Sequence, residues 1–408
     1  MSDSDDFMSD EFNRKKAREL LENENIVEAI MDITKGMVES KAREIIESLI
    51  YGQASVYAPD LDYTTKVGLK RTKRPQESTF VFGTGSIGID TTWSICRNFF
   101  INFEEVSYVT MGALTAFTDN YAKQIDHKMT YFAEFNTAKP ALISQIKTIL
   151  EENRVKAVRS IGGGIATQVT DVLTAPALYI GANYIPQVFD NPFLSRFDNF
   201  FRIFGSKQMW KDITDVQGKN IGNSQHILNS NTTNEMEKYK DCFMLLKEIN
   251  SKKEKVYRKN YENIIVSFDE IRDKWLESKD KILDDLEGKE SLFPRDTEIG
   301  LRRINSSAWL NIFKREYFIE NKILFIKANE EDLKAGIESL ERSVTEKSKF
   351  FEWRAEQRKI SQEARKAFIS LAGELKNLSL REQAQKLTEA GHTVSHMTVK
   401  RWRDEEKV

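Results

Sequence analysis

The sequence predicts a mostly α protein with a central α/β segment, a long helical hairpin or coiled coil, and a C-terminal helix-turn-helix. Apolar residues recur at three- and four-residue steps through much of the 408-residue chain, a spacing typical of amphipathic helices. Only seven prolines interrupt the chain, which disfavours a strand-rich sandwich. The clearest strand-like runs lie between residues 59 and 215, next to glycine-rich turns.

Composition limits the classes of function. Apolar residues make up 40% of the chain and charged residues 30%, which indicates a soluble globular protein with exposed helices. The formal net charge of −2 argues against a uniformly basic surface, so any contact with nucleic acid must come from local patches. Cys96 and Cys242 have neither metal-site nor disulfide spacing. We therefore expect a cytoplasmic protein with no metal site and no membrane partner.

Changes in composition divide the chain into successive segments. The first twelve residues are acidic, and Asp215 to Thr233 is polar and rich in Asn and Gly, which predicts a linker. The expected segments are an acidic disordered tail (1–12), a helical unit (13–58), an α/β domain with glycine-rich turns (59–215), a linker (216–233), a helical domain (234–330), a charged connecting helix (331–376) and a helix-turn-helix (377–408).

A basic cluster follows the N-terminal helical unit. It holds five cations within nine residues and no acid. A dense cluster of this kind attracts phosphate, so one interpretation is a patch for nucleic acid or nucleotide, and the alternative is a solvated loop. The cluster consists of Lys66, Lys70, Arg71, Lys73 and Arg74.

Glycine-rich turns suggest a nucleotide site. Thr79 to Phe82 alternate like a buried strand, and Gly83, Gly85 and Gly88 then form G-x-G-x-x-G before a helical pattern. Such a turn lets backbone amides approach a pyrophosphate. A second predicted strand, residues 155–161, runs into Gly162, Gly163 and Gly164 and then a predicted helical segment to Leu173.

These runs carry a family resemblance. FVFGTGSIG, EEVSYVTMGAL and RVKAVRSIGGGIATQVTD, in that order, resemble the nucleotide-binding half of iron-type alcohol dehydrogenases and dehydroquinate synthases. The resemblance covers about 100 residues and implies an α/β fold with a possible nucleotide cofactor. It does not extend to that family's metal ligands, because His226 is the only histidine between the triple glycine and the tail. No catalytic residue is carried over.

Two further apolar patterns predict helices. Phenylalanines three or four residues apart between Phe193 and Phe204 favour a helix that buries one face, with base stacking as the alternative. From residue 234 to 286 apolar residues again step by three and four, with a phase slip near residues 250–256. This second stretch predicts an internal helical hairpin or a coiled coil between subunits, and so a possible self-association surface.

The tail predicts two short helices. Ser379 and Glu382 have capping-box spacing, and Gly391 suits a helix stop. Ser395 can cap a second helix, whose Val399 and Trp402 form a buried side. The remaining outward positions suit a major groove. We expect the bases to be read by Ser395, His396, Thr398, Lys400 and Arg401, with phosphates bound by Arg381, Lys386 and Arg403.

The tail also resembles the helix-turn-helix of serine recombinases, resolvases and small phage or plasmid regulators. The shared pattern is S-L-R-x-x-A-x-x-L followed by G-x-x-V-S-x-x-T-V-x-R-W. The resemblance implies binding of double-stranded DNA in the regulation, replication or segregation of a phage, plasmid or mobile element. Two alternatives stay open: a nucleotide-binding enzyme or switch, and an oligomeric assembly protein whose tail contacts protein. No complete catalytic constellation is present in the sequence, which disfavours an enzyme.

Overall fold

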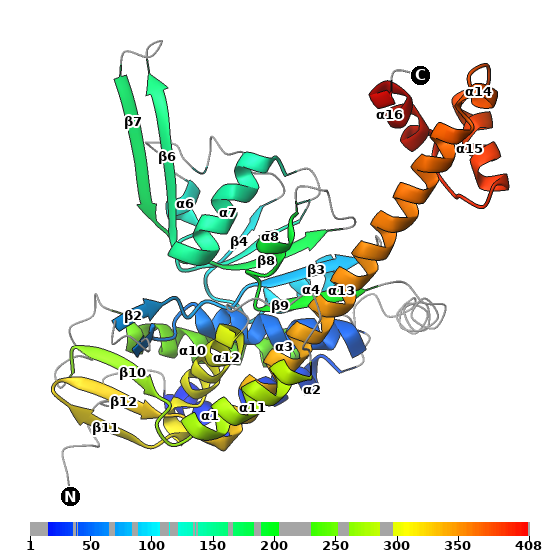
Figure 1. The fold of residues 1–408 in the computed structure, drawn as a ribbon. Helices are drawn as coiled ribbons and strands as arrows, with labels where there is room; N and C mark the ends of the chain where they lie inside the picture. The colour runs from blue at the N-terminus through cyan, green and yellow to red at the C-terminus, as the bar shows by residue number, and fades with distance from the viewer. Residues whose placement is uncertain are drawn as a thin grey trace, which may run out of the picture. The chain divides into compact units, whose positions relative to one another are not determined.

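A computed structural model describes residues 15–35, 38, 40–64, 70–83, 89–106, 114, 121–133, 135, 138–161, 166–182, 189–203, 230–251, 261–285 and 297–406 (Figure 1). The chain forms two compact units, residues 1–347 and residues 348–408, which we call the large unit and the C-terminal unit. The large unit holds a central parallel sheet and many helices, which confirms the predicted mostly α class with a central α/β segment. The predicted acidic tail, residues 1–12, lies outside the described residues.

Three of the described helices lie within the predicted N-terminal helical segment. They are α1 (Lys15–Asn23), α2 (Ile26–Ile33) and α3 (Ser40–Ser55). The Asn25 side chain accepts hydrogen bonds from the first backbone amides of α2, which fixes where that helix begins. The apolar stripe of α3 is buried and contacts strands of the parallel sheet.

The parallel sheet is the centre of the large unit. Its strands are β3 (Thr79–Gly83), β4 (Phe103–Val106), β5 (Met129–Phe132), β8 (Ala177–Ala182) and β9 (Asn199–Ile203). They lie in the order β4-β5-β8-β3-β9, and all neighbours are parallel. Helices α4 (Ile89–Cys96), α6 (Tyr121–Gln124), α7 (Pro140–Glu152) and α8 (Asn191–Leu194) occur in the connections.

Aromatic side chains fill both sides of this sheet, as expected where helices cover both faces. On one side the ring of Trp93 lies 5.1 Å from that of Tyr131. On the other, the ring of Phe80 stacks on Phe200 at 5.7 Å and contacts those of three further phenylalanines, Phe189, Phe193 and Phe197. The predicted role of this aromatic segment in the core is therefore confirmed.

The predicted single helix through the same segment is wrong beyond Leu194. Residues 199–203 form strand β9, so the adjacent Phe200 and Phe201 point to opposite sides of the sheet. A strand that is buried on both faces has apolar residues at nearly every position. Such a run also contains apolar pairs three and four residues apart, which is the spacing that predicts a helix. Phe204 lies outside the described residues.

The predicted strand over residues 155–161 is confirmed, but it belongs to a long hairpin around the triple glycine and is not followed by a helix. Strands β6 (Arg154–Ile161) and β7 (Ala166–Leu173) pair antiparallel over their whole length, apart from the five-stranded sheet (Figure 1). The helix predicted up to Leu173 is wrong. Its sequence, ATQVTDVL, is rich in β-branched residues, which favour a strand once a partner strand is available.

The predicted helical hairpin or coiled coil over residues 234–286 is not found. Helix α10 (Ser230–Asn250) is separated from α11 (Arg272–Asp284) by strand β10 (Asn263–Ser267). β10 lies parallel to β12 (Ile323–Lys327), which also pairs with β11 (Tyr317–Glu320). Ile264 and Val266 of β10 are buried. In the sequence, these two apolar residues cannot be told apart from the apolar residues of the helical patterns before and after them.

The remaining elements of the large unit complete one core. They are the β1 (Leu61–Thr64) and β2 (Lys70–Lys73) hairpin, helix α12 (Thr297–Leu310) and a 3-10 turn, η4 (Ile312–Lys314). Buried residues of α10 and α12 share a hydrophobic core with α1 to α3, so elements on both sides of the predicted linker pack together. Of that linker, 216–233, only the last four residues are described, within α10.

The C-terminal unit has its own hydrophobic core. Helix α13 (Glu330–Ser370) leads into α14 (Ala372–Leu375), α15 (Leu380–Glu389) and α16 (His396–Glu406). Trp402 packs against Phe368 of α13 with ring centroids 5.8 Å apart. The predicted segment 377–408 is therefore only part of a packed unit that also needs the end of α13. Its buried residues are Ala364, Phe368, Leu375, Ala384, Leu387, Val399 and Trp402.

No helix in the described parts of the chain is long and apolar enough to cross a membrane.

Candidate functional site

Hydrogen bonds between residues close in the chain fix both ends of α15 and the turn into α16. The predicted capping box is confirmed: the Ser379 side chain accepts from the Glu382 amide, and the Glu382 side chain accepts from the Ser379 amide. At the end of α15, Gly391 has φ +89 and His392 N donates to Leu387 O at 2.8 Å. This is a Schellman stop, which sets the direction in which the chain enters α16.

Gly391 provides a direct test of this turn. We expect Gly391→Ala to destabilise the C-terminal unit by about 1–2 kcal/mol, because an L-residue is strained at this positive φ. No atom lies within 4 Å of the added methyl group, so backbone strain is the whole effect. Gly373→Ala is the matched control, since it has equal space and no positive φ. Amide hydrogen exchange of α15 and α16 measures the difference, and equal protection in both variants would contradict it.

One face of α16 is buried and the opposite face is open. Val399 and Trp402 are almost fully buried in the unit's core. Met397, Lys400, Arg401 and Asp404 follow each other at three- and four-residue steps and line an open hollow of about 420 Å³. This exposed stripe of α16 carries two cations, one carboxylate and a methionine that is 61% exposed.

The structure separates the predicted base-reading residues into two groups. His396, Lys400 and Arg401 are exposed. Ser395, which is also exposed, and the half-buried Thr398 stabilise the start of α16, since their hydroxyl oxygens lie 3.0 Å apart and Thr398 N donates to Ser395 Oγ. Met397 belongs to the exposed stripe and was missed by the sequence analysis. Its position two residues before Val399 is the signal that could have shown it, because that spacing puts it on the far side of the helix.

The predicted phosphate-binding residues lie on the surface of α15 and α16. Arg381, Lys386 and Arg403 are all exposed. Lys386 Nζ lies 2.9 Å from Glu374 Oε2, a surface ion pair of the kind that contributes little stability and yields readily to a stronger anion. Asp404 and the two following glutamates gather at the C-terminal end of α16. The N-terminal half of the helix is therefore the more favourable end for a polyanion.

The predicted basic cluster is not an exposed patch as far as it is described. Arg74 is 4% exposed and lies in the interior, and Lys73 pairs with Glu298 at 3.1 Å. The prediction was wrong for Arg74 because a charged residue is buried only when distant parts of the chain supply partners, which spacing does not reveal. Lys66 and the side chains of Lys70 and Arg71 lie outside the described part of the structure.

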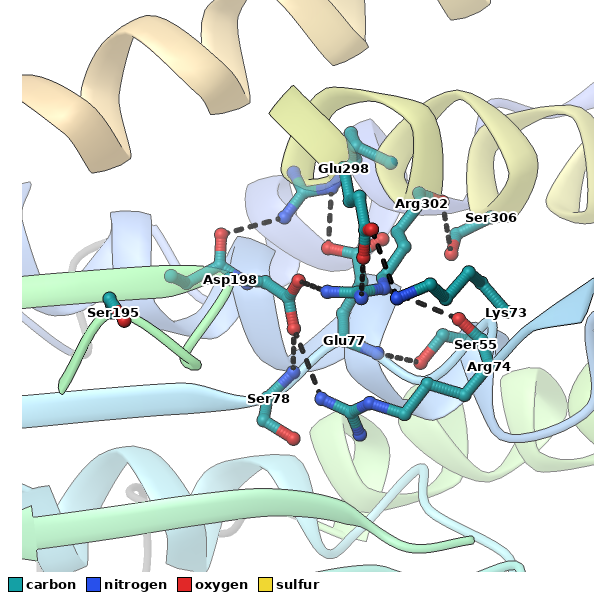
Figure 2. Close-up of polar contacts among 12 residues, drawn as sticks. Ser55, Lys73, Arg74, Glu77, Ser78, Ser195, Asp198, Glu298, Arg302 and Ser306 are labelled. Carbon is teal, nitrogen blue, oxygen red and sulfur yellow. Dashed lines mark hydrogen bonds and ion pairs between the residues drawn. The ribbon is translucent and has the colours of Figure 1, made fainter. Parts of the chain in front are cut away.

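Arg74 belongs to a buried network of ionic groups between β3, β9 and α12 (Figure 2). Asp198, which is fully buried, accepts from Ser78 N at 2.8 Å, pairs with Arg302 and lies 3.7 Å from Arg74 Nη2. A second pair, Glu77 Oε2 and Arg303 Nε, is 2.9 Å apart. Most of these charges are paired, which indicates that the network joins α12 to the sheet as a structural element.

Burial changes the acidity of this network. Burial, with the nearby Arg302, lowers the pKa of Arg74 to about 10, although Asp198 acts in the opposite direction. Burial also raises the pKa of Glu77 in spite of Arg303. For Arg302 burial would lower the pKa, but Asp198 and Glu298 outweigh it and raise the pKa. The cations therefore stay charged at neutral pH, and removing an anion would leave them unpaired.

Different elements flank the two glycine-rich segments of the sequence. Strand β3 and helix α4 flank residues 84–88, so the strand–turn–helix order predicted for Gly83, Gly85 and Gly88 is present, although Gly85 and Gly88 themselves are not described. In the dinucleotide fold the first two strands are adjacent, whereas β5 and β8 separate β3 from β4. Gly162, Gly163 and Gly164 also lie outside the described residues, between two antiparallel strands. Nucleotide binding at these turns stays a prediction.

Neither a metal site nor a similar known protein assigns a function to the described parts of the chain. Among the described residues, no group of three or more His, Cys, Asp or Glu side chains could hold a metal ion. No protein-family model matches the chain, and no curated protein matches it either.

Proposed function

We propose that the protein binds double-stranded DNA through its C-terminal unit, with α16 in the major groove. The observation that carries this proposal is the exposed stripe of α16, which bears Lys400 and Arg401 and is fixed from behind by the buried Trp402. A short rigid helix with such a face has the size and charge that the major groove accepts. The preceding helix, α15, then lies across the backbone.

The side chains suggest how the groove is read. Arg401 and Lys400 match the O6 and N7 acceptors of guanine, and the exposed Met397 suits apolar contact with the methyl group of thymine. Asp404 can accept from the amino group of cytosine. Arg381, Lys386 and Arg403 supply phosphate contacts, which position the helix without reading sequence.

The biological setting is proposed on the resemblance of the tail. Regulation, replication or segregation of a phage, plasmid or mobile element is the work of the proteins whose helix-turn-helix this tail resembles. In this proposal the C-terminal unit finds the DNA site, and the large unit acts there.

Binding-site selection on random duplex DNA, followed by mobility shifts with the selected site, tests the proposal. We expect Arg401→Gln to weaken binding by about 1–3 kcal/mol, roughly 5- to 150-fold, and to relax preference at one base pair. Lys359→Gln, an exposed cation on α13 away from α16, is the control and should bind as the unchanged protein does. Arg381→Gln should weaken binding to all sequences by a similar factor. It should also reduce the slope of log K against log salt concentration by about 1.

Two results would contradict the proposal. One is failure of the full chain to select any duplex at low salt. The other is equal affinity for the selected site before and after deletion of residues 377–408.

A further inference from the structure

The large unit holds a pocket of about 680 Å³ with both polar and apolar groups in its lining. Three of its lining segments, at Gln76, Asn102 and Asp126–His127, come just before strands β3, β4 and β5, respectively. The pocket therefore lies at the amino-terminal ends of the parallel strands, the opposite end from the glycine turn after β3. The end of α10 and the chain after α3 complete its wall. Its volume is in the range that encloses a small organic ligand.

Lys247 gives the pocket a cation that forms no ion pair with a carboxylate in the described parts of the chain. It is half-buried in the last turn of α10. In the orientation of the Asn102 amide that satisfies its hydrogen bonds, its nitrogen donates to Ile101 O and its oxygen accepts from Lys247 Nζ at 3.1 Å. A half-buried ammonium held by a neutral group keeps its charge available to an anion.

Two acids line the pocket, the exposed Asp60 and the half-buried Asp126, and Asp126 is already engaged. Asp126 Oδ1 accepts from Ala175 N at 2.8 Å and lies 2.9 Å from His127 Nδ1. Partial burial would raise the pKa of Asp126, but the hydrogen bonds from His127 and the Ala175 amide outweigh it and lower the pKa. The Asp126 carboxylate thus orients the imidazole of His127. Because Asp60 is exposed to solvent, the half-buried Lys247 is the charged group that we assign to a ligand.

A buried amide supplies the second anchor point. Gln76 is 3% exposed and lines the pocket, and its Oε1 has no hydrogen-bond partner among the described residues. A buried carbonyl oxygen left without a donor costs about 1–3 kcal/mol, which a ligand N–H or O–H would recover. Asn250 donates to Tyr57 O at 2.7 Å and so fixes the wall between these two points.

We propose that this pocket binds a small phosphorylated ligand with a hydrogen-bond donor on its uncharged part, the chemistry of a nucleoside monophosphate. Lys247 binds the phosphate, and Gln76 Oε1 accepts from an amino or hydroxyl group of the nucleoside. This site is independent of DNA binding by α16, because its residues all belong to the large unit. It is also distinct from the glycine turn that follows β3.

Calorimetry on the full chain with AMP, GMP, CMP and UMP, each beside its free nucleoside, tests the assignment. We expect at least one monophosphate to bind at least 10-fold more tightly than its nucleoside. Lys247→Gln should remove that difference, while Lys281→Gln, an exposed lysine on α11, should leave it unchanged. Inorganic phosphate is included because binding of phosphate alone, with no gain from the nucleoside, would overturn the role of Gln76.

Gln76→Leu provides a second variant of similar size. It should leave the free protein at least as stable, because it removes an unpaired buried oxygen, and weaken the bound monophosphate at least 5-fold. Absence of binding by all four monophosphates would overturn the proposal, and so would unchanged affinity in both Lys247→Gln and Gln76→Leu.

Discussion

Trp402→Ala is expected to destabilise the C-terminal unit by about 3–5 kcal/mol, the usual cost of removing a buried tryptophan. Trp402 is 2% exposed and packs against Phe368, so its loss opens a cavity between α16 and the end of α13. The unit's core has few other large side chains, and partial collapse cannot refill that space. We expect α15 and α16 to lose their fixed packing and DNA binding to be lost with it.

Hydrogen exchange measured by mass spectrometry separates the two units in the full chain. Protection should fall across residues 364–406 and remain unchanged in β3 and β8 of the large unit. Met397→Ala is the matched control on the same helix, because a side chain that is 61% exposed contributes little to packing. Unchanged protection in Trp402→Ala would show that α16 is not held by this contact.

Asp198→Ala is expected to destabilise the large unit by about 3–5 kcal/mol. Asp198 accepts from Ser78 N and faces both Arg302 and Arg74, so the substitution removes the anion beside Arg74 and the Ser78 amide and leaves Arg302 paired with Glu298 alone. Removing one partner of a buried ion pair costs more stability than the pair contributes, because the other partner remains buried and charged without a counterion. Figure 2 shows how the carboxylate lies between the two arginines.

Urea denaturation of the full chain measures this effect. Glu262→Ala removes an ion pair on the surface, Glu262 with Lys322 at 2.7 Å, and should change the midpoint little because water screens both partners. Asp198→Asn, which keeps the shape and part of the hydrogen bonding, should fall between the two. A midpoint shift in Asp198→Ala as small as that of Glu262→Ala would show that water reaches the buried network.

The sequence was most informative where structure depends on neighbours in the chain. The cap at Ser379, the stop at Gly391 and the buried side of α16 follow from hydrogen bonds and apolar steps within a few residues. The strand at residues 79–82 was found in the same way. For the candidate interface, exposed Lys400 and Arg401 were predicted, whereas Met397 was not.

The errors occur where a distant partner decides the conformation. β7 and β10 were predicted as helical, and each is a strand because β6 and β12 offer backbone hydrogen bonds that local spacing does not encode. Arg74 was expected on the surface, but Asp198, more than a hundred residues later, draws it inside.

By itself, then, the sequence determined the helical class, the order of its main local elements and the two capped helices of the tail, because these depend on short-range hydrogen bonding and periodic burial. Only the tertiary structure decided that α16 is supported by the end of α13, that Arg74 and Asp198 share an interior, and that Gln76 and Lys247 line one pocket. The physical reason is that burial and ion pairing join residues far apart in the chain, and a linear pattern records no distance in space.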